Sequence, residues 1–87
     1  MKRYSLFNYN LILQKEQEGG YTVKVPALPG CITYGKTLEE AKLMAANAIK
    51  SYISSLLKHG ENIPTDDTLF ITSVTLQLPV RRKKTYA

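Results

Sequence analysis

Three stretches of the chain alternate apolar and polar residues, which is the pattern of strands with one buried face. They span residues 4–14, 20–25 and 69–78, and residues 31–35 form a shorter fourth candidate. In the first stretch, the more apolar set is expected to face the core and comprises Phe7, Tyr9, Leu11 and Leu13. In the last stretch, the more apolar set comprises Phe70, Thr72, Val74, Leu76 and Leu78.

The period changes in residues 37–59, where apolar residues recur every three or four positions, as on one face of a helix. This stripe comprises Leu38, Ala41, Ala45, Ala48, Ile49, Tyr52, Ile53 and Leu56. Thr37 and Glu40 form a capping box, in which the Thr37 hydroxyl accepts from the backbone N–H of Glu40 and Glu40 reaches back. Gly60 is expected to end the helix in a left-handed conformation.

These elements follow one another in the order β-β-β-α-β, which predicts an α+β fold. Short links between the first three strands favour an antiparallel meander, with the single helix packed on one face. The helix then serves as a crossover, so we expect the last strand to pair in parallel with the first. Residues 1–80 are expected to form one domain, followed by a basic C-terminal tail in residues 81–87.

A tight turn is predicted between the second and third strands, at Leu28-Pro29-Gly30-Cys31. Proline fixes the first central residue near a φ of about −65°, and glycine permits the positive φ that a type II turn needs next. Pro26 stops the strand that precedes this turn. We therefore expect a positive φ at Gly30.

The net charge is +5, and one run accounts for most of it: Arg81, Arg82, Lys83 and Lys84. A run of this kind is usually a solvated, frayed chain end. Its alternative role is phosphate contact, because clustered Lys and Arg are typical of nucleic-acid binding.

The sequence predicts a cytoplasmic protein. No stretch is long and apolar enough for a membrane span. The N-terminus lacks the apolar core of a signal peptide, since polar residues interrupt the first strand candidate. The single cysteine, Cys31, excludes a disulfide within one chain and is most simply a small buried hydrophobe.

Candidate catalytic groups are few, and we expect neither an enzyme nor a metal or cofactor site. Two-metal phosphoryl chemistry needs several converging carboxylates, yet residues 4–14 contain no Asp or Glu. Glu39 and Glu40 fit the first turn of the helix, where they complement its dipole. The single histidine, His59, fits the positive charge favoured at a helix C-terminus.

Three tyrosines allow two interpretations. Tyr9, Tyr34 and Tyr52 could stack on single-stranded RNA, but packing in the sheet–helix layer or an oligomer interface is the simpler role. The sheet face opposite the helix is expected to carry Tyr4, Leu6 and Ile12, with Tyr21 or Thr22 beside them. Because a small sheet leaves this face open, we expect a homo-oligomer.

The order of residues from the second strand to the helix resembles the motif of the HicB-like antitoxin family. The matching residues are Tyr21, Val23, Pro26, Leu28, Pro29, Gly30, Cys31, Thr33, Gly35, Thr37, Glu40 and Ala41. The match continues at Ala48, Ile49, Tyr52, Leu56, Gly60, Glu61, Ile63 and Pro64. The whole run at fixed spacing is far more specific than a Pro-Gly turn alone.

This resemblance implies a partial RNase H-like fold and a binding function. Such an antitoxin neutralises a small HicA-type toxin, which cleaves mRNA, by masking its active surface. Longer members commonly carry a DNA-binding module, whereas only residues 80–87 follow Pro79 here, which leaves sequence-specific DNA binding unsupported. The alternative is a nucleic-acid-binding or regulatory oligomeric module that uses the basic tail and exposed tyrosines.

Overall fold

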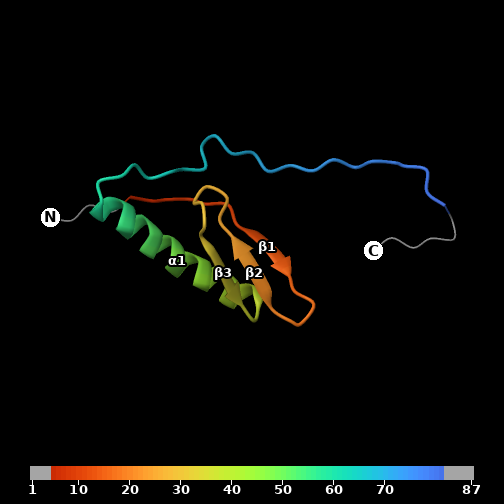
Figure 1. The fold of residues 1–87 in the computed structure, drawn as a ribbon, viewed down its shortest axis with the longest axis horizontal. Coiled ribbons are helices and arrows are strands. Elements are labelled where there is room, and N and C mark those ends of the chain that lie inside the picture. The colour runs from red at the N-terminus through yellow and green to blue at the C-terminus, as the bar shows by residue number, and fades with distance from the viewer. Residues whose placement is uncertain (1–4, 82–87) are drawn as a thin grey trace.

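The structure is a computed structural model that describes residues 5–81, in which three strands precede one helix (Figure 1). The strands are β1 (Ile12–Lys15), β2 (Tyr21–Lys24) and β3 (Ile32–Gly35), and the helix is α1 (Leu38–Lys58). Both strand pairs are antiparallel, and the sheet order is β1-β2-β3. The predicted α+β fold, with a meander and a single helix, is confirmed for these elements.

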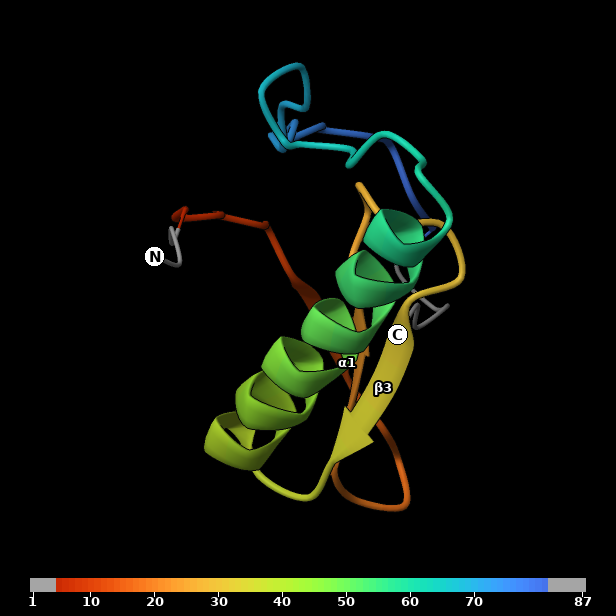
Figure 2. The same ribbon diagram turned by 90° about the vertical axis from the view of Figure 1, so that its left-hand side faces the viewer.

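The register of the strands separates two faces of the sheet. Leu13, Val23 and Thr33 lie side by side across the three strands, and Ile12, Lys24 and Ile32 form the next row. Since neighbouring residues of a strand point to opposite faces, these rows belong to different sides. The helix covers the side of Val23 (Figure 2), whereas Ile12 and Ile32 on the other side stay exposed among residues 5–81.

Two groups of buried side chains make up the core. In the first, Val23 packs with Ala41 and Ala45, and partly buried Leu11, Leu13 and Tyr21 surround them. The second joins the loop after β2 to the middle of α1 and contains Val25, Leu28 and Cys31, packed by Tyr9, Leu11, Ala48, Ile49 and Tyr52. The predicted inward stripe of the helix is therefore largely confirmed.

Leu38 is the exception in that stripe, since its side chain is 52% exposed. The sheet ends at Gly35, three residues earlier. It therefore offers little surface to the first residue of the helix.

The first strand is shorter than predicted. Residues 4–14 show the alternation of a strand, but only Ile12–Lys15 pair with β2. Because β2 has four residues, it offers no partner to residues 5–11. Leu11 and Leu13 nevertheless face the core as expected, and Tyr9 joins them, whereas Phe7 stays exposed.

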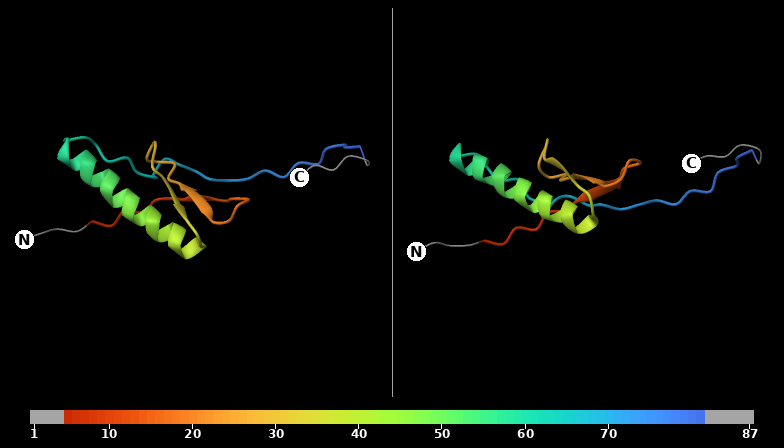
Figure 3. Two further views of the ribbon diagram at one scale, coloured as in Figure 1. Left: turned by 60° about the horizontal axis from the view of Figure 1, so that its bottom comes forward. Right: turned by 90° about the horizontal axis from the view of Figure 1, so that it is seen from below.

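The predicted last strand is absent from the described structure, so the order β-β-β-α-β is wrong in its final element. Residues 69–78 are exposed and unpaired, and the chain runs clear of the sheet there (Figures 1 and 3). Parallel pairing with β1 does not form. The physical reason lies in what the alternation of apolar and polar residues determines. It gives an extended segment one apolar side, but it does not determine which strand edge of the sheet that segment pairs with.

Candidate functional site

The Pro-Gly turn forms as predicted. The Leu28 carbonyl accepts from the backbone N–H of Cys31 at 3.0 Å, and the φ of Gly30 is +81°. A further turn precedes it, in which the Val25 carbonyl accepts from the Leu28 N–H at 3.0 Å. Val25 N–H also donates to the Cys31 carbonyl at 3.1 Å. The loop therefore closes on itself through backbone hydrogen bonds.

This loop is fastened to the rest of the molecule at two points. Leu28 is fully buried and Cys31 nearly so, while the Pro26 and Pro29 rings stay exposed. The Tyr52 hydroxyl donates to the Pro29 carbonyl at 2.9 Å, which connects the turn to α1. These motif residues therefore determine the shape of the loop and its place on the helix.

The helix start follows the predicted capping box. Thr37 Oγ1 accepts from the Glu40 N–H at 3.0 Å. Glu40 Oε1 reaches back to the N–H of Lys36, the residue before the cap, at 2.8 Å. Both acidic residues of the first turn, Glu39 and Glu40, lie where the helix dipole favours negative charge.

Gly35 and Thr33 lie where β3 approaches the helix. A Cβ on Gly35 would lie 2.3 Å from the backbone nitrogen of Ala41, so only glycine permits this approach. Thr33 is half-buried on the helix-covered face, next to Val23, and its hydroxyl has no hydrogen-bond partner among the described residues. Tyr21 lies on the same face and packs on the core. The motif residues thus belong to the scaffold.

The three tyrosines singled out from the sequence all donate to loop carbonyls. Tyr9 bonds to Pro64, Tyr34 to Gly19 and Tyr52 to Pro29, at 2.5, 2.9 and 2.9 Å. Burial raises the pKa of the Tyr9 phenol, and the charge of Asp66 raises it further. Tyr9 and Tyr52 also pack against the buried cluster, which supports the packing interpretation for these two, whereas the Tyr34 side chain is 48% exposed.

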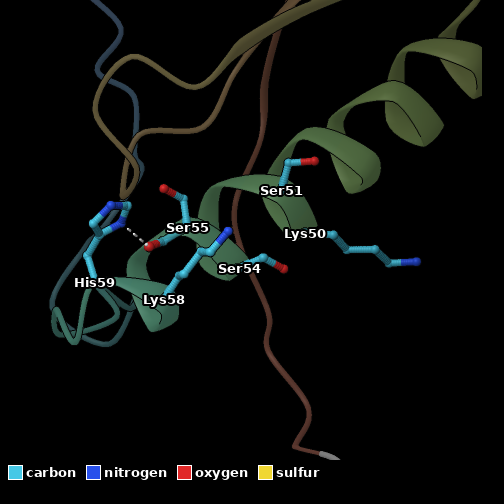
Figure 4. A pocket seen from close by; sticks show the side chains of 6 residues that line it. All are labelled: Lys50, Ser51, Ser54, Ser55, Lys58 and His59. Carbon is cyan, nitrogen blue, oxygen red and sulfur yellow. Dashed lines mark hydrogen bonds between the residues drawn. The ribbon is translucent and has the colours of Figure 1, made fainter.

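The remaining reactive side chains also have structural partners. Burial raises the pKa of the Cys31 thiol, which keeps it protonated at neutral pH. His59 Nδ1 donates to the Ser55 carbonyl at 2.8 Å and so caps the helix end (Figure 4). Within residues 5–81, no three His, Cys, Asp or Glu side chains gather where they could hold a metal ion. The described part of the chain has no helix of the length and hydropathy that crossing a bilayer requires.

A shallow hollow lies along the last turns of α1 (Figure 4). Its lining residues are Lys50, Ser51, Ser54, Ser55, Lys58 and His59. The hollow contains no carboxylate, and its lysines are exposed. It therefore has neither the enclosure nor the convergent groups of an active site.

The uncovered side of the sheet is the strongest candidate for a binding surface. We call it the open face, and the strand register assigns it Ile12, Gln14, Thr22, Lys24, Ile32 and Tyr34. Ile12, Ile32 and Tyr34 are exposed by 46%, 58% and 48%. Exposed apolar and aromatic side chains held together on paired strands are typical of protein-binding surfaces.

This face only partly matches the sequence prediction. Ile12 and Thr22 lie on it as expected, whereas Tyr21 faces the helix. Leu6 lies in the unpaired segment before β1, and Tyr4 lies outside the described residues. Ile32 was missed, and Tyr34 was singled out for stacking or packing without being placed on this face, although the alternation of residues 31–35 separates both from Cys31 and Gly35.

The basic tail can be followed only at its first residue. Arg81 is exposed, while Arg82, Lys83 and Lys84 lie outside the described residues. Phosphate contact by this run therefore stays a prediction.

Comparison with known proteins gives consistent matches over most of the chain. Residues 9–76 match the family model for the HicB-like antitoxin of bacterial toxin-antitoxin systems. A UPF0150 protein of Thermoplasma acidophilum is 52% identical over 64 residues, which is 74% of this chain and 93% of that protein. A UPF0150 protein of Synechocystis is 39% identical over 64 residues, or 74% of this chain and 81% of that one.

A relative with a functional name is also similar. Antitoxin HicB 1 of Photorhabdus laumondii is 33% identical over 75 residues, which is 86% of this chain but 48% of that protein. The matched region of the family model contains the Pro-Gly turn, the whole of α1 and most of residues 69–78.

Proposed function

The chain belongs to the HicB-like antitoxin family, and from this premise we propose that it neutralises a small HicA-type toxin that cleaves mRNA. The family match over residues 9–76 is the observation that carries the proposal. Inhibition of this kind requires a binding surface and no catalysis by the chain itself. The motif residues suit such a role, because they fix the scaffold that presents the surface.

We propose that the toxin is bound on the open face. Ile12, Ile32 and Tyr34 supply apolar and aromatic contacts, which dominate the centres of protein interfaces. The pairing of β1 and β3 with β2 fixes the spacing of these side chains before binding. A toxin held there has its RNA-binding surface masked by the sheet.

Two further features accompany this proposal. Cleavage of mRNA takes place in the cytoplasm, so the antitoxin is expected to act there. We also expect a homo-oligomer. Because the open face is assigned to the toxin, the surface left for self-association is the outer edge of β1, which has no strand beside it among the described residues.

Titration calorimetry with the toxin encoded beside the gene for this chain tests the surface. We expect Ile32→Glu to weaken binding by about tenfold or more, since it places a charge at the centre of an apolar contact. Ser54→Glu is the matched control, because it adds the same charge on the exposed side of α1. Equal affinities of Ile32→Glu and the parent chain would exclude the open face, and no binding by the parent would exclude the antitoxin function.

The nucleic-acid alternative has weaker support. Tyr9 and Tyr52 pack on the core, so their ring faces are not free to stack on bases. Of the three tyrosines only Tyr34 is half exposed, and one ring does not make the row of stacking platforms that single-stranded RNA binding uses.

A further inference from the structure

Residues 69–80, which we call the arm, run away from the sheet and the helix (Figure 3). Their apolar side chains are exposed. The arm contains no Asp, Glu, Lys or Arg. Phe70 is 89% exposed and Val74 is 78% exposed. Because apolar residues alternate along it, an extended arm has one apolar side, formed by Phe70, Val74, Leu76 and Leu78. An uncharged segment with this pattern is a template for pairing with another chain.

The arm starts beside the first strand of its own chain. The Tyr9 hydroxyl donates to the Pro64 carbonyl, and the Asn10 N–H donates to the Asp66 carboxylate. These two contacts align residues 64–66 with residues 9–10, so both segments run in the same direction. A turn follows, in which the Leu69 N–H donates to the Asp66 carbonyl at 3.0 Å.

The chain's own first strand is too short to receive the arm. If the arm continued beside β1 from the contact of Asn10 with Asp66, residue 71 would lie beside Lys15, where β1 ends. The apolar positions from Val74 onward would then project past the sheet. Twelve extended residues span about 40 Å, whereas the four residues of β1 span about 13 Å.

A second copy of the chain does not share this restriction. Within residues 5–81, the sheet order leaves the outer edge of β1 without a strand. The edge segment is apolar, since it contains Leu11, Ile12 and Leu13. The contacts at residues 64–66 fix the register of an arm against β1 of its own chain. They set no register against β1 of a second copy. An arm arriving from a second copy is therefore free to place its apolar centre, Val74 to Leu78, at this edge.

We propose that two copies of this chain exchange arms, and that the arm of each adds as a fourth strand to the outer edge of β1 in the other. Each copy gives and receives one arm, which makes the contact two-fold symmetric. The added strand pairs the backbone groups of the arm, and its apolar side continues the layer beneath α1. The open face stays free, so this assembly does not depend on toxin binding.

Sedimentation equilibrium of two matched variants tests the assembly. We expect the parent chain to be a dimer at about tens of micromolar. Val74→Glu should raise the dissociation constant of the dimer by about tenfold or more, because it puts a charge on the buried side of the arm. Thr75→Glu adds the same charge on the opposite side and should leave the dimer intact. Circular dichroism of α1 checks that both variants fold.

A monomeric parent chain, or equal effects of Val74→Glu and Thr75→Glu, would overturn the proposal. Nuclear Overhauser measurements on mixed isotope-labelled and unlabelled chains give an independent test of where the arm lies. We expect contacts between arm methyl groups of one copy and residues 11–13 of the other. The proposed exchange of arms would be overturned if the arm methyl groups contacted only residues of their own chain. It would also be overturned if they contacted only the arm of the other copy.

Discussion

At the scale of single residues, two glycines of the motif fulfil different physical requirements. Gly30 has a φ of +81°, and a Cβ there would meet no atom within 4 Å. Gly35 has space for no Cβ, because the backbone of Ala41 lies 2.3 Å from its place. One glycine therefore provides a backbone conformation, and the other permits β3 and α1 to approach.

Alanine substitutions should separate these two requirements. We expect Gly30→Ala to lower the free energy of unfolding by about 1 kcal/mol, the cost of a left-handed alanine. Gly35→Ala should cost about 2–3 kcal/mol or more, since backbone must move to admit the methyl group. Urea denaturation measures both, and a smaller loss for Gly35→Ala than for Gly30→Ala would contradict the packing described.

The thiol of Cys31 should be inert in the folded protein. It is 6% exposed and its pKa is raised by burial, so little thiolate is available for reaction at neutral pH. Alkylation by iodoacetamide should be on the order of 100-fold slower in buffer than in denaturant. Similar rates in both conditions would show that the turn does not hold this side chain in the core.

At the scale of the elements, two side-chain hydrogen bonds far apart along α1 have different roles. The cap bond joins Thr37 to Glu40, and the Tyr52 hydroxyl joins the helix to the Pro-Gly turn. The alanines between them, Ala41 and Ala45, pack directly on the sheet. The helix therefore positions both the loop and the covered side of the sheet.

Removing these two bonds should have separate and additive effects. Thr37→Ala should lower the free energy of unfolding by about 1 kcal/mol, through loss of the cap. Tyr52→Phe should cost about 1 kcal/mol, since the Pro29 carbonyl loses its tyrosine donor. The double variant should show the sum, because the sites are distant. Ser54→Ala serves as an exposed control, and a double variant no less stable than either single one would refute independent roles.

Elements with local causes could be predicted from the sequence, and those that need a distant partner could not. The turn at Gly30 and the cap at Thr37 depend on residues within four positions, and both formed as expected. The length of β1 depends on how many residues β2 offers, which alternation does not reveal. The arm shows the same limit, because its pattern predicts a strand but not the edge that it pairs with.

The candidate site follows the same division. The turn at Gly30 and the cap at Thr37 could be predicted from the sequence as scaffold features. The close approach of Gly35 to Ala41 and the bond from Tyr52 to Pro29 could not, because each joins separate elements. Ile32 was identified only from the strand register, which also placed Tyr34 on the same face as Ile12 and Thr22. The residues of a binding face that spans three strands are far apart in the sequence, so no single local sequence pattern identifies them.

At the scale of the whole molecule, a small body carries a long exposed segment, and the principal extents are 66 × 30 × 19 Å. The body consists of the three strands and α1, while the arm provides much of the exposed apolar surface. Our proposals assign different partners to these parts. The open face binds the toxin, and the arm binds a second copy.

The basic run should contribute little to inhibition. Toxins that bind RNA are themselves usually basic, so they repel the charges at residues 81–84. A chain ending at Val80 should therefore inhibit as well as the intact one. If the run instead contacts phosphate, binding to RNA should weaken with salt by about 0.7–0.9 log units of affinity per log unit of salt for each phosphate neutralised. Inhibition lost only on removal of the run would contradict this view of the tail.

The most direct test of the antitoxin proposal is the rate of RNA cleavage by the toxin encoded beside the gene for this chain, measured as the chain is titrated in. The account predicts that cleavage falls to the background rate once the chain is in molar excess, with no nuclease activity from the chain alone in the presence or absence of Mg²⁺. Full toxin activity at a saturating concentration of the intact chain would contradict it.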